Sequence, residues 1–138
     1  MLTDSPRLVA VLDDEVIGFL THVNEEEQPQ TSPVWFLRVD DEIVVYNKPD
    51  TARLDAIDAN PKVAFNLRGD RRADAVVTME GMARRSELPP AAELPGYLDK
   101  YARDIERLGW TPESFSADYR SAITITITRV RSWGLGKG

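Results

Sequence analysis

Residues 123–128 read Ile-Thr-Ile-Thr-Ile-Thr, so that apolar and polar side chains alternate without a fault. Successive side chains of a β-strand point to opposite faces of the sheet, and the alternation therefore predicts a strand with one buried and one polar face. Five other stretches, bounded by turn-forming residues, also have strand-like composition. They are residues 16–23, 31–39, 42–47, 63–67 and 75–85. Short, hairpin-like connections favour antiparallel pairing of these roughly six strands.

Helices are expected between the strands. Capping residues, proline at the first turn and apolar side chains spaced three or four apart predict them. They lie at residues 3–12, 51–60, 97–108 and just after Thr111-Pro112. Rossmann-type alternation and a GxGxxG motif are both absent. We therefore expect a mainly β fold, a small antiparallel barrel with peripheral helices, in a single domain spanning residues 1–138.

The chain contains no cysteine and one histidine, His22. The lack of cysteine excludes disulfides, thiol nucleophiles and thiolate metal sites, and favours a reducing compartment. His22 lies in an apolar strand without an evident partner, which favours a structural or surface role over that of a catalytic base. The acidic clusters lack the spacing of a calcium-binding loop, and no metal site is expected.

The length of the apolar runs bears on location. None approaches the roughly 20 residues needed to cross a bilayer, and the N-terminal residues lack the pattern of a signal peptide. We expect a cytoplasmic protein without a membrane span.

The net charge of −6 is unevenly distributed. Residues 1–50 carry 11 acidic and 3 basic side chains, and residues 51–138 carry 12 acidic and 14 basic ones, which gives −8 and +2. The negative total argues against nucleic-acid binding, whereas the distribution predicts that an anionic small molecule binds to the later segment. Two arginine pairs in that segment are either solvated basic edges or contacts to such a ligand. They are Arg71-Arg72 and Arg84-Arg85.

Residues 46–53, Tyr-Asn-Lys-Pro-Asp-Thr-Ala-Arg, place two cations and a hydroxyl around a strand-to-helix turn. The free N–H groups and dipole at a helix N-terminus favour an anion. Arg53 can bind phosphate through two N–H groups, Lys48 adds a point charge, and Thr51 can cap the helix or donate. An ordinary capped turn with two surface cations is the alternative, and the spacing alone does not decide between them.

Four motifs occur in order along the chain: Thr-Ser-Pro-Val-Trp-Phe at residues 31–36, Val-Tyr-Asn-Lys at 45–48, Thr-Ala-Arg at 51–53 and Ala-Asn-Pro-Lys-Val-Ala at 59–64. Together they resemble the split β-barrel family related to pyridoxamine 5′-phosphate oxidase. More narrowly, they resemble its actinobacterial branch of deazaflavin (coenzyme F420)-dependent reductases. The resemblance runs from about residue 8 to Trp133. It implies a homodimer with two flavin or deazaflavin sites at the subunit interface.

The resemblance also implies roles for individual residues. Thr51 and Arg53 match the hydroxyl-x-base pattern that binds the cofactor phosphate. The strand from Ser32 to Trp35 resembles the one whose backbone lies along the ring, and Asn47 with Lys48 resembles the segment beside the ribityl-phosphate. The cofactor-binding residues implied are Ser32, Pro33, Val34, Trp35, Asn47, Lys48, Thr51 and Arg53.

Two departures from the oxidase pattern matter. Ala52 replaces one cation of the Ser-Arg-Lys triplet, and Lys48 can compensate for that charge. The residues that bind the oxidase's substrate phosphate have no clear counterpart, which argues against pyridoxamine phosphate oxidation. Trp133, in a closing Arg-Ser-Trp-Gly segment, either approaches the ring edge from the partner chain or packs in the core.

The resemblance implies an oxidoreductase that transfers hydride between coenzyme F420 and a small electron-poor organic substrate. A cofactor of this kind needs no protein nucleophile, which accords with the lack of cysteine. The basic loop containing Arg68, Arg71 and Arg72 could receive the coenzyme's acidic tail. Two alternatives stay open: an FMN-dependent reductase or oxidase on the same fold, and a non-catalytic protein that binds a flavin, deazaflavin or haem-like ligand.

Overall fold

The computed structural model describes residues 1–135 and contains one seven-stranded antiparallel sheet with helices around it. The strands are β1 (Gly18–Val23), β2 (Pro29–Val34), β3 (Leu37–Val39), β4 (Glu42–Asn47), β5 (Lys62–Leu67), β6 (Val76–Ser86) and β7 (Ser121–Trp133). The helices are α1 (Pro6–Asp14), α2 (Ala52–Ala59), α3 (Tyr97–Arg107) and α4 (Pro112–Asp118), with short 3₁₀ turns at Leu2–Asp4 and Ala91–Glu93. The expected mainly β fold is confirmed.

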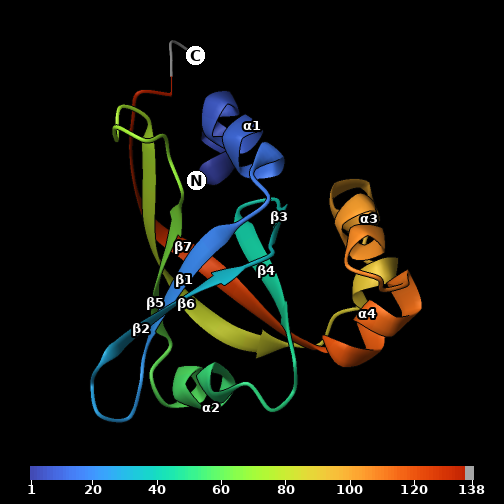
Figure 1. The fold of residues 1–138 in the computed structure, drawn as a ribbon. Helices are drawn as coiled ribbons and strands as arrows, with labels where there is room; N and C mark the ends of the chain where they lie inside the picture. The colour runs from blue at the N-terminus through green and yellow to red at the C-terminus, as the bar shows by residue number, and fades with distance from the viewer. Residues whose placement is uncertain (136–138) are drawn as a thin grey trace.

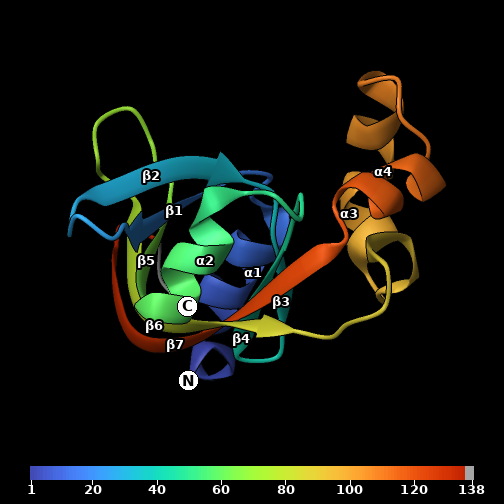
Figure 2. The same ribbon diagram turned by 90° about the horizontal axis from the view of Figure 1, so that it is seen from below.

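The sheet curls into a barrel (Figures 1 and 2), and its two edge strands are joined by a short segment of the chain, not by hydrogen bonds between strands. Its strand order is β2-β1-β5-β6-β7-β4-β3, so the two edge strands, β2 and β3, are consecutive in sequence. Only Trp35 and Phe36 separate them. The strand expected at residues 31–39 is thus divided, which accounts for the seventh strand.

The division at Phe36 has a physical cause. The backbone N–H of Phe36 donates to the hydroxyl of Tyr101 from α3, at 2.9 Å, instead of to a neighbouring strand. Pro29 and Pro33 have no N–H to donate, and β2 pairs on one side only, with β1. Proline is tolerated in such an edge strand.

The alternation that predicted the last strand is borne out only in part in β7. Ile123 and Ile125 are fully buried and Thr126 is exposed, but Thr124, expected on the polar face, is only 5% exposed, and its hydroxyl lies 2.7 Å from that of Ser86. The same strand pairs with both β4 and β6, and its register with β6 shifts between Glu80 and Gly81. A Cβ atom at Gly81 would lie 2.7 Å from the Ile125 side chain, so the expected bulge and close approach are both present.

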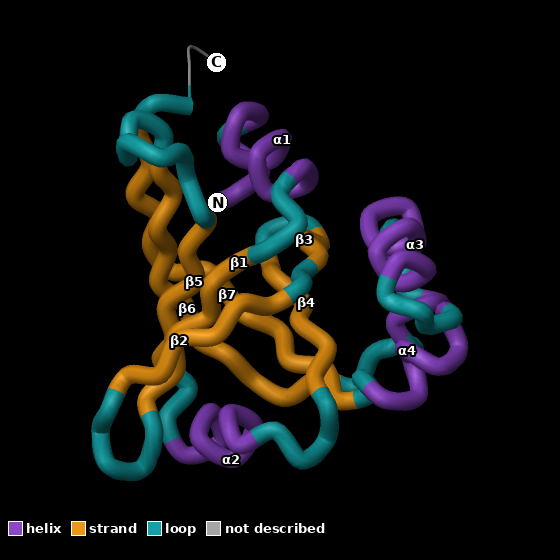
Figure 3. Tube along the Cα trace, in the orientation of Figure 1, coloured by secondary structure: helices purple, strands orange, loops and turns teal. Residues whose placement is uncertain are grey.

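Two apolar clusters fill the molecule, one on each side of β4. The first is largely aliphatic and lies inside the barrel, against α1 and α2. The second is rich in aromatic rings and joins β4 to α3 and α4, which form a helical lobe beside the barrel (Figure 3). No helix within residues 1–135 is long and apolar enough to cross a membrane.

Candidate functional site

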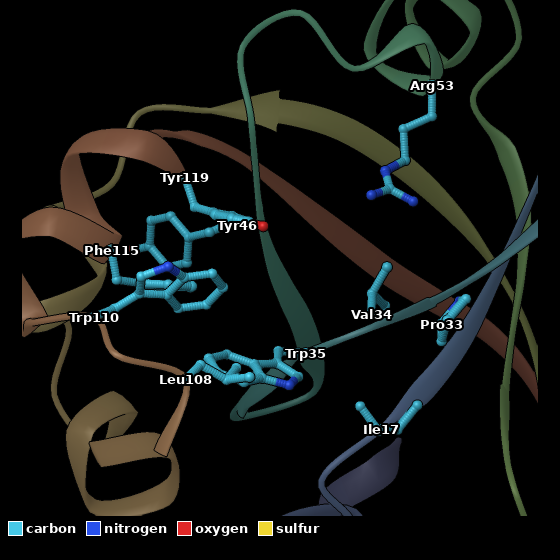
Figure 4. Close-up of a pocket in the computed structure, with 10 residues that line it drawn as sticks. All are labelled: Ile17, Pro33, Val34, Trp35, Tyr46, Arg53, Leu108, Trp110, Phe115 and Tyr119. Carbon is cyan, nitrogen blue, oxygen red and sulfur yellow. The ribbon is translucent and has the colours of Figure 1, made fainter. Parts of the chain in front are cut away.

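A cleft of about 300 Å³ lies between the barrel and the helical lobe (Figure 4). One side, termed here the barrel wall, consists of Ile17, Pro33, Val34, Tyr46 and Arg53. The opposite side, termed the helical wall, consists of Leu108, Trp110, Phe115 and Tyr119. Trp35 lies between the two walls, at the point where β2 gives way to β3.

Arg53 is the one charged residue that lines this cleft, and it is half-buried. Its Nε donates to the Oδ1 atom of Asn47 at 2.7 Å. The amide of Asn47 is only 1% exposed, and its Nδ2 donates to the carbonyls of Val45 at 3.1 Å and Ser121 at 3.0 Å. A buried side chain tied to β4 and β7 therefore fixes the guanidinium.

The two Nη groups of Arg53 have no acceptor within residues 1–135, and no carboxylate there forms an ion pair with it. Burial lowers the pKa of Arg53 from its ordinary value, although arginine stays protonated at every physiological pH. Figure 4 shows the guanidinium pointing into the cleft, opposite the aromatic rings. A half-buried cation without an anion is stabilised by an anionic group, and phosphate matches its two remaining donor faces.

The start of α2 adds donors beside Arg53. Thr51 occupies the N-cap position, but its hydroxyl makes no capping hydrogen bond. The expected side-chain cap is therefore absent, and the hydroxyl remains available to a ligand. Amide groups in the first turn of a helix also lack intrahelical partners, which favours an anion at this point.

The helical wall and the neighbouring Trp35 together present a flat aromatic surface. Trp35 stacks on Tyr101 with ring centroids 4.6 Å apart and planes 11° from parallel. Phe115 stacks on Tyr119 at 4.7 Å and on Trp35 at 5.3 Å. Leu108 extends this wall and is 44% exposed, because it follows the last residue of α3. Such a surface suits a planar ligand.

The eight residues implied by the resemblance fall into two groups in the structure. Four line the cleft, and they are Pro33, Val34, Trp35 and Arg53. The others, Ser32, Asn47, Lys48 and Thr51, lie outside its lining. Asn47 supports Arg53 from behind, and the exposed Lys48 lies 5.6 Å from the ring centre of Tyr119.

The helical wall is the part of the cleft that the sequence motifs missed. Tyr46 belonged to a quoted motif without being assigned a contact, and the four helical-wall residues belonged to none. The helical spacing that contains Leu108 was visible, and so were Trp110 and the capping signal at Thr111. Nothing in that spacing indicates that the helical lobe packs beside β4, because the contact is made between segments distant in sequence.

The paired arginines of β6 are used within the chain. Arg84 forms an ion pair with Glu42 at 3.0 Å, and Arg85 contacts Asp55 at 2.9 Å and Asp58 at 2.8 Å. These ion pairs within the chain favour a surface edge over ligand contacts for Arg84-Arg85, but the edge is ion-paired, which the sequence did not predict.

The basic loop after β5 lies far from Arg53. Arg68, Arg71 and Arg72 are exposed and follow the C-terminal end of β5, whereas α2 precedes its N-terminal end. A six-residue strand spans roughly 20 Å, and Figure 1 shows the loop and α2 at opposite ends of the barrel. Within one chain, this loop is therefore badly placed to receive the tail of a ligand bound at Arg53.

Two other residues with alternative interpretations can now be placed. Trp133 is 51% exposed and donates from Nε1 to the carbonyl of Ala73 at 2.9 Å, so its interpretation as a core residue is wrong. His22 is buried in β1 and does not line the cleft. Its position agrees with a structural role in preference to that of a catalytic base.

An antiparallel barrel closed through a divided strand, with a cation-bearing cleft at its side, defines a split β-barrel protein. Residues 5–134 match the family model described as pyridoxamine 5′-phosphate oxidase. The chain belongs to that family.

Solved structures share this fold at low sequence identity. A conserved hypothetical protein from Mycobacterium tuberculosis is 21% identical with a TM-score of 0.75, over 95% of this chain and 85% of that one. An F420 reductase is 19% identical with a TM-score of 0.66, over 88% and 94%. The haem storage protein HutZ from Vibrio cholerae is 16% identical with a TM-score of 0.67, over 96% of both chains. No curated protein matches the sequence.

Proposed function

We propose that this protein is an oxidoreductase that binds coenzyme F420 in the cleft and transfers hydride between it and a small electron-poor organic substrate. The observation that carries the proposal is Arg53, a half-buried cation with no acid partner within residues 1–135, fixed by Asn47 at one end of an aromatic cleft. The likeness to an F420 reductase, at 19% identity, supports the choice of coenzyme only through the shared fold.

The donor groups present fit a phosphate-bearing, ring-containing cofactor. Arg53 and the uncapped Thr51 hydroxyl offer N–H and O–H donors to a phosphate at the start of α2. The backbone of β2, from Ser32 to Val34, and the Trp35 ring offer a surface along which a tricyclic ring could lie. Lys48 adds positive charge nearby.

When bound, the cofactor supplies the hydride chemistry, and the chain supplies binding and orientation. Arg53, held by Asn47, fixes the phosphate end and thereby sets where the ring lies along β2. The helical wall would exclude water from the face opposite β2 and offer apolar contacts to a flat substrate.

FMN is the alternative cofactor, because its terminal phosphate would satisfy the same Arg53 and Thr51 donors. A non-catalytic binding protein is the second alternative, and the haem storage protein with this fold illustrates it. Fluorescence titration with FMN and with coenzyme F420 under identical conditions separates the cofactors. Tight binding without turnover of quinones, enones or nitroaromatics would indicate a binding protein.

We also propose that residues 1–138 form one domain that assembles as a homodimer and so completes the cofactor site. Met82 and Trp133, at 40% and 51% exposure, leave apolar surface uncovered on β6 and β7. Equilibrium sedimentation should give twice the monomer mass of 15.5 kDa. A monomer at micromolar concentration would contradict this assembly.

The Arg53→Ala variant tests the cofactor site. Loss of two charge-assisted hydrogen bonds should weaken the binding of the preferred cofactor by about a hundredfold. Arg103→Ala is the matched control, because Arg103 is exposed on α3, lies outside the cleft and carries the same charge. Equal affinity of the wild-type protein and the Arg53 variant would reject the proposed phosphate site.

A further inference from the structure

The polar side-chain atoms that line the cleft beside the barrel are hydrogen-bond donors. None of the ten lining residues is acidic, and none carries an amide or an imidazole. The guanidinium of Arg53 and the indole N–H groups of Trp35 and Trp110 donate only. The hydroxyl of Tyr46 is already used, because it donates to the carbonyl of Pro89 at 2.6 Å. The lining therefore offers a ligand many donors and few acceptors.

Two of the donors that remain belong to adjoining rings of the helical wall. The indole N–H of Trp110 and the hydroxyl of Tyr119 have no hydrogen-bond partner within residues 1–135. Both side chains are partly exposed, and neither polar atom is among the buried, unpartnered atoms of that range. The two donor atoms therefore reach the surface of the molecule. The ring centroids lie 5.8 Å apart, so both donors serve one region of the cleft.

The charges around this region are positive. Arg53 lies across the cleft from Trp110 and Tyr119 (Figure 4), and the ammonium of Lys48 lies 5.6 Å from the ring centre of Tyr119. Asp118 precedes Tyr119 in the chain, but it is exposed and does not line the cleft. A ligand oxygen that accepts hydrogen bonds is thus favoured here, whereas a ligand N–H group loses water without gaining a strong acceptor.

We propose that Trp110 and Tyr119 determine substrate specificity: the indole N–H and the hydroxyl hold a carbonyl or nitro oxygen of a planar, uncharged substrate. This inference rests on the proposed hydride transfer, which requires the substrate to lie beside the cofactor ring. Arg53 is then engaged with the cofactor phosphate, and the helical-wall donors remain for the second ligand. Planar compounds that carry positive charge, or whose polar groups only donate, are rejected.

The indole N–H signals in nuclear magnetic resonance spectra offer a direct test that needs no cofactor, because the chain has three tryptophans. Trp133 is an internal control, since its Nε1 donates to the carbonyl of Ala73 and it does not line the cleft. Titration of the full-length protein with nitrobenzene should shift the Trp110 signal saturably and leave the Trp133 signal in place. No response of Trp110 at about five-millimolar nitrobenzene would overturn the proposal.

Two further probes test the need for the oxygen. Toluene has the ring without the oxygens, and benzamidine is a planar cation of similar size whose polar group donates. Each should bind about fivefold more weakly than nitrobenzene, as expected for the loss of a hydrogen bond between uncharged groups. Equal affinities for the three probes would show that ring contact alone accounts for binding, and would reject the proposal.

Variants that remove one donor and keep a ring identify the groups involved. Trp110→Phe and Tyr119→Phe should each weaken nitrobenzene binding by about fivefold and leave toluene binding nearly unchanged. The Trp110 signal reports binding to the Tyr119 variant, and broadening of the ligand's own ring signals reports it for the Trp110 variant. Tyr97→Phe is the matched control, because Tyr97 is buried outside the cleft lining. Equal weakening of both probes would mean that the rings act through packing alone, which would contradict the assigned role.

Titration with FMN and coenzyme F420 separates this inference from the proposed cofactor site. Both phenylalanine variants should bind the preferred cofactor nearly as well as the wild type, because they keep the ring surface. Cofactor binding without a preference for nitrobenzene over toluene would reject the donor pair alone. A preference for nitrobenzene in a protein that binds neither cofactor would reject the proposed oxidoreductase, and would support the donor pair as a recognition site for planar compounds with acceptor oxygens.

Discussion

The barrel wall of the cleft carries its charge on Arg53, which buried hydrogen bonds hold to the sheet, whereas the helical wall consists of uncharged side chains packed against one another. Of the barrel wall, Val34 belongs to the aliphatic cluster and Tyr46 to the aromatic one, whereas Trp110, Phe115 and Tyr119 of the helical wall all pack in the aromatic cluster. The fixed cation determines where the anionic group of a ligand lies. The flat rings favour ligands whose remaining part is planar.

The polar contacts of α3 with the barrel converge on the strand break at Phe36. The hydroxyl of Tyr101 accepts from the Phe36 N–H and donates to the carbonyl of Val16 at 2.6 Å. The ammonium of Lys100 donates to the carbonyls of Phe36 at 3.0 Å and Leu12 at 3.2 Å. The width of the cleft therefore depends on α3 as much as on the barrel.

On the barrel wall, where removal of Arg53 has the largest expected effect on cofactor binding, Asn47 should act through Arg53. Asn47→Ala should weaken cofactor binding by about tenfold, because the guanidinium loses its orientation. In the Arg53→Ala background, which alone costs about a hundredfold, the Asn47 change should add almost nothing. Titration of the wild type, both single variants and the double variant gives the coupling.

An additive result would show that Asn47 contacts the ligand itself or affects the whole fold. Urea denaturation of the same four proteins separates these cases, because loss of the buried Asn47 amide leaves the carbonyls of Val45 and Ser121 without a partner. The Asn47 change should therefore lower the free energy of unfolding by the same amount in the wild type and in the Arg53→Ala background.

The second effect concerns the contact between the walls. Tyr101→Phe should lower the free energy of unfolding by about 2 kcal/mol, because it leaves the buried N–H of Phe36 without an acceptor. Tyr97→Phe is the control, since the equally buried Tyr97 makes no hydroxyl hydrogen bond within residues 1–135. Similar losses for both variants would show that ring packing, and not the strand break, sets the stability here.

The contrast between the walls also shows what the sequence can predict. The barrel wall follows from local signals: the alternation in β7, the turn at residues 48–51 and the Thr51-x-Arg53 spacing each act over a few residues. The break of the long strand at Phe36 was not visible, because its cause is a hydroxyl 65 positions away, on Tyr101.

The helical wall could not be predicted for the same reason. Its helices were expected from spacing and caps, but their place beside β4 depends on contacts between rings distant in sequence, such as Trp35 with Phe115. The hydrogen bond between Asn47 and Arg53 joins residues six positions apart and is therefore local. The burial of Asn47, however, depends on Ser121 of the distant strand β7. Local patterns identified the charge, and tertiary packing decides how it is held.

A smaller effect is expected on the helical wall. Trp110→Ala should weaken cofactor binding by about fivefold, because it removes ring surface from the cleft. The affinity for inorganic phosphate should stay unchanged, since phosphate contacts only the Arg53 end. Trp110→Phe retains a ring and should recover most of the loss. Equal weakening of cofactor and phosphate binding would mean that the two walls do not act separately.

The smallest effect is a pH dependence at Lys100, which lies with its ammonium 3.7 Å from the ring centre of Phe36. Burial lowers the pKa of Lys100 to about 8, an effect that the nearby acids Asp13, Asp14 and Glu15 partly oppose. In the unfolded chain the pKa of lysine is about 10.4. Between these values the unfolded chain holds a proton that the folded chain has released, so the free energy of unfolding should rise with pH.

Lys100→Met should abolish this contribution. The stability of the wild type relative to the variant should increase by about 1 kcal/mol from pH 7.5 to 10, after allowance for the partial solvent contact of the ammonium. Chemical denaturation at several pH values measures the difference, and titrations common to both proteins cancel. Lys62→Met, at an exposed position of β5, should show no such trend. A difference for Lys100 that falls with pH would mean that the two carbonyls and the Phe36 ring stabilise the charged ammonium more than burial opposes it. The contact between α3 and the barrel would then depend on a charge.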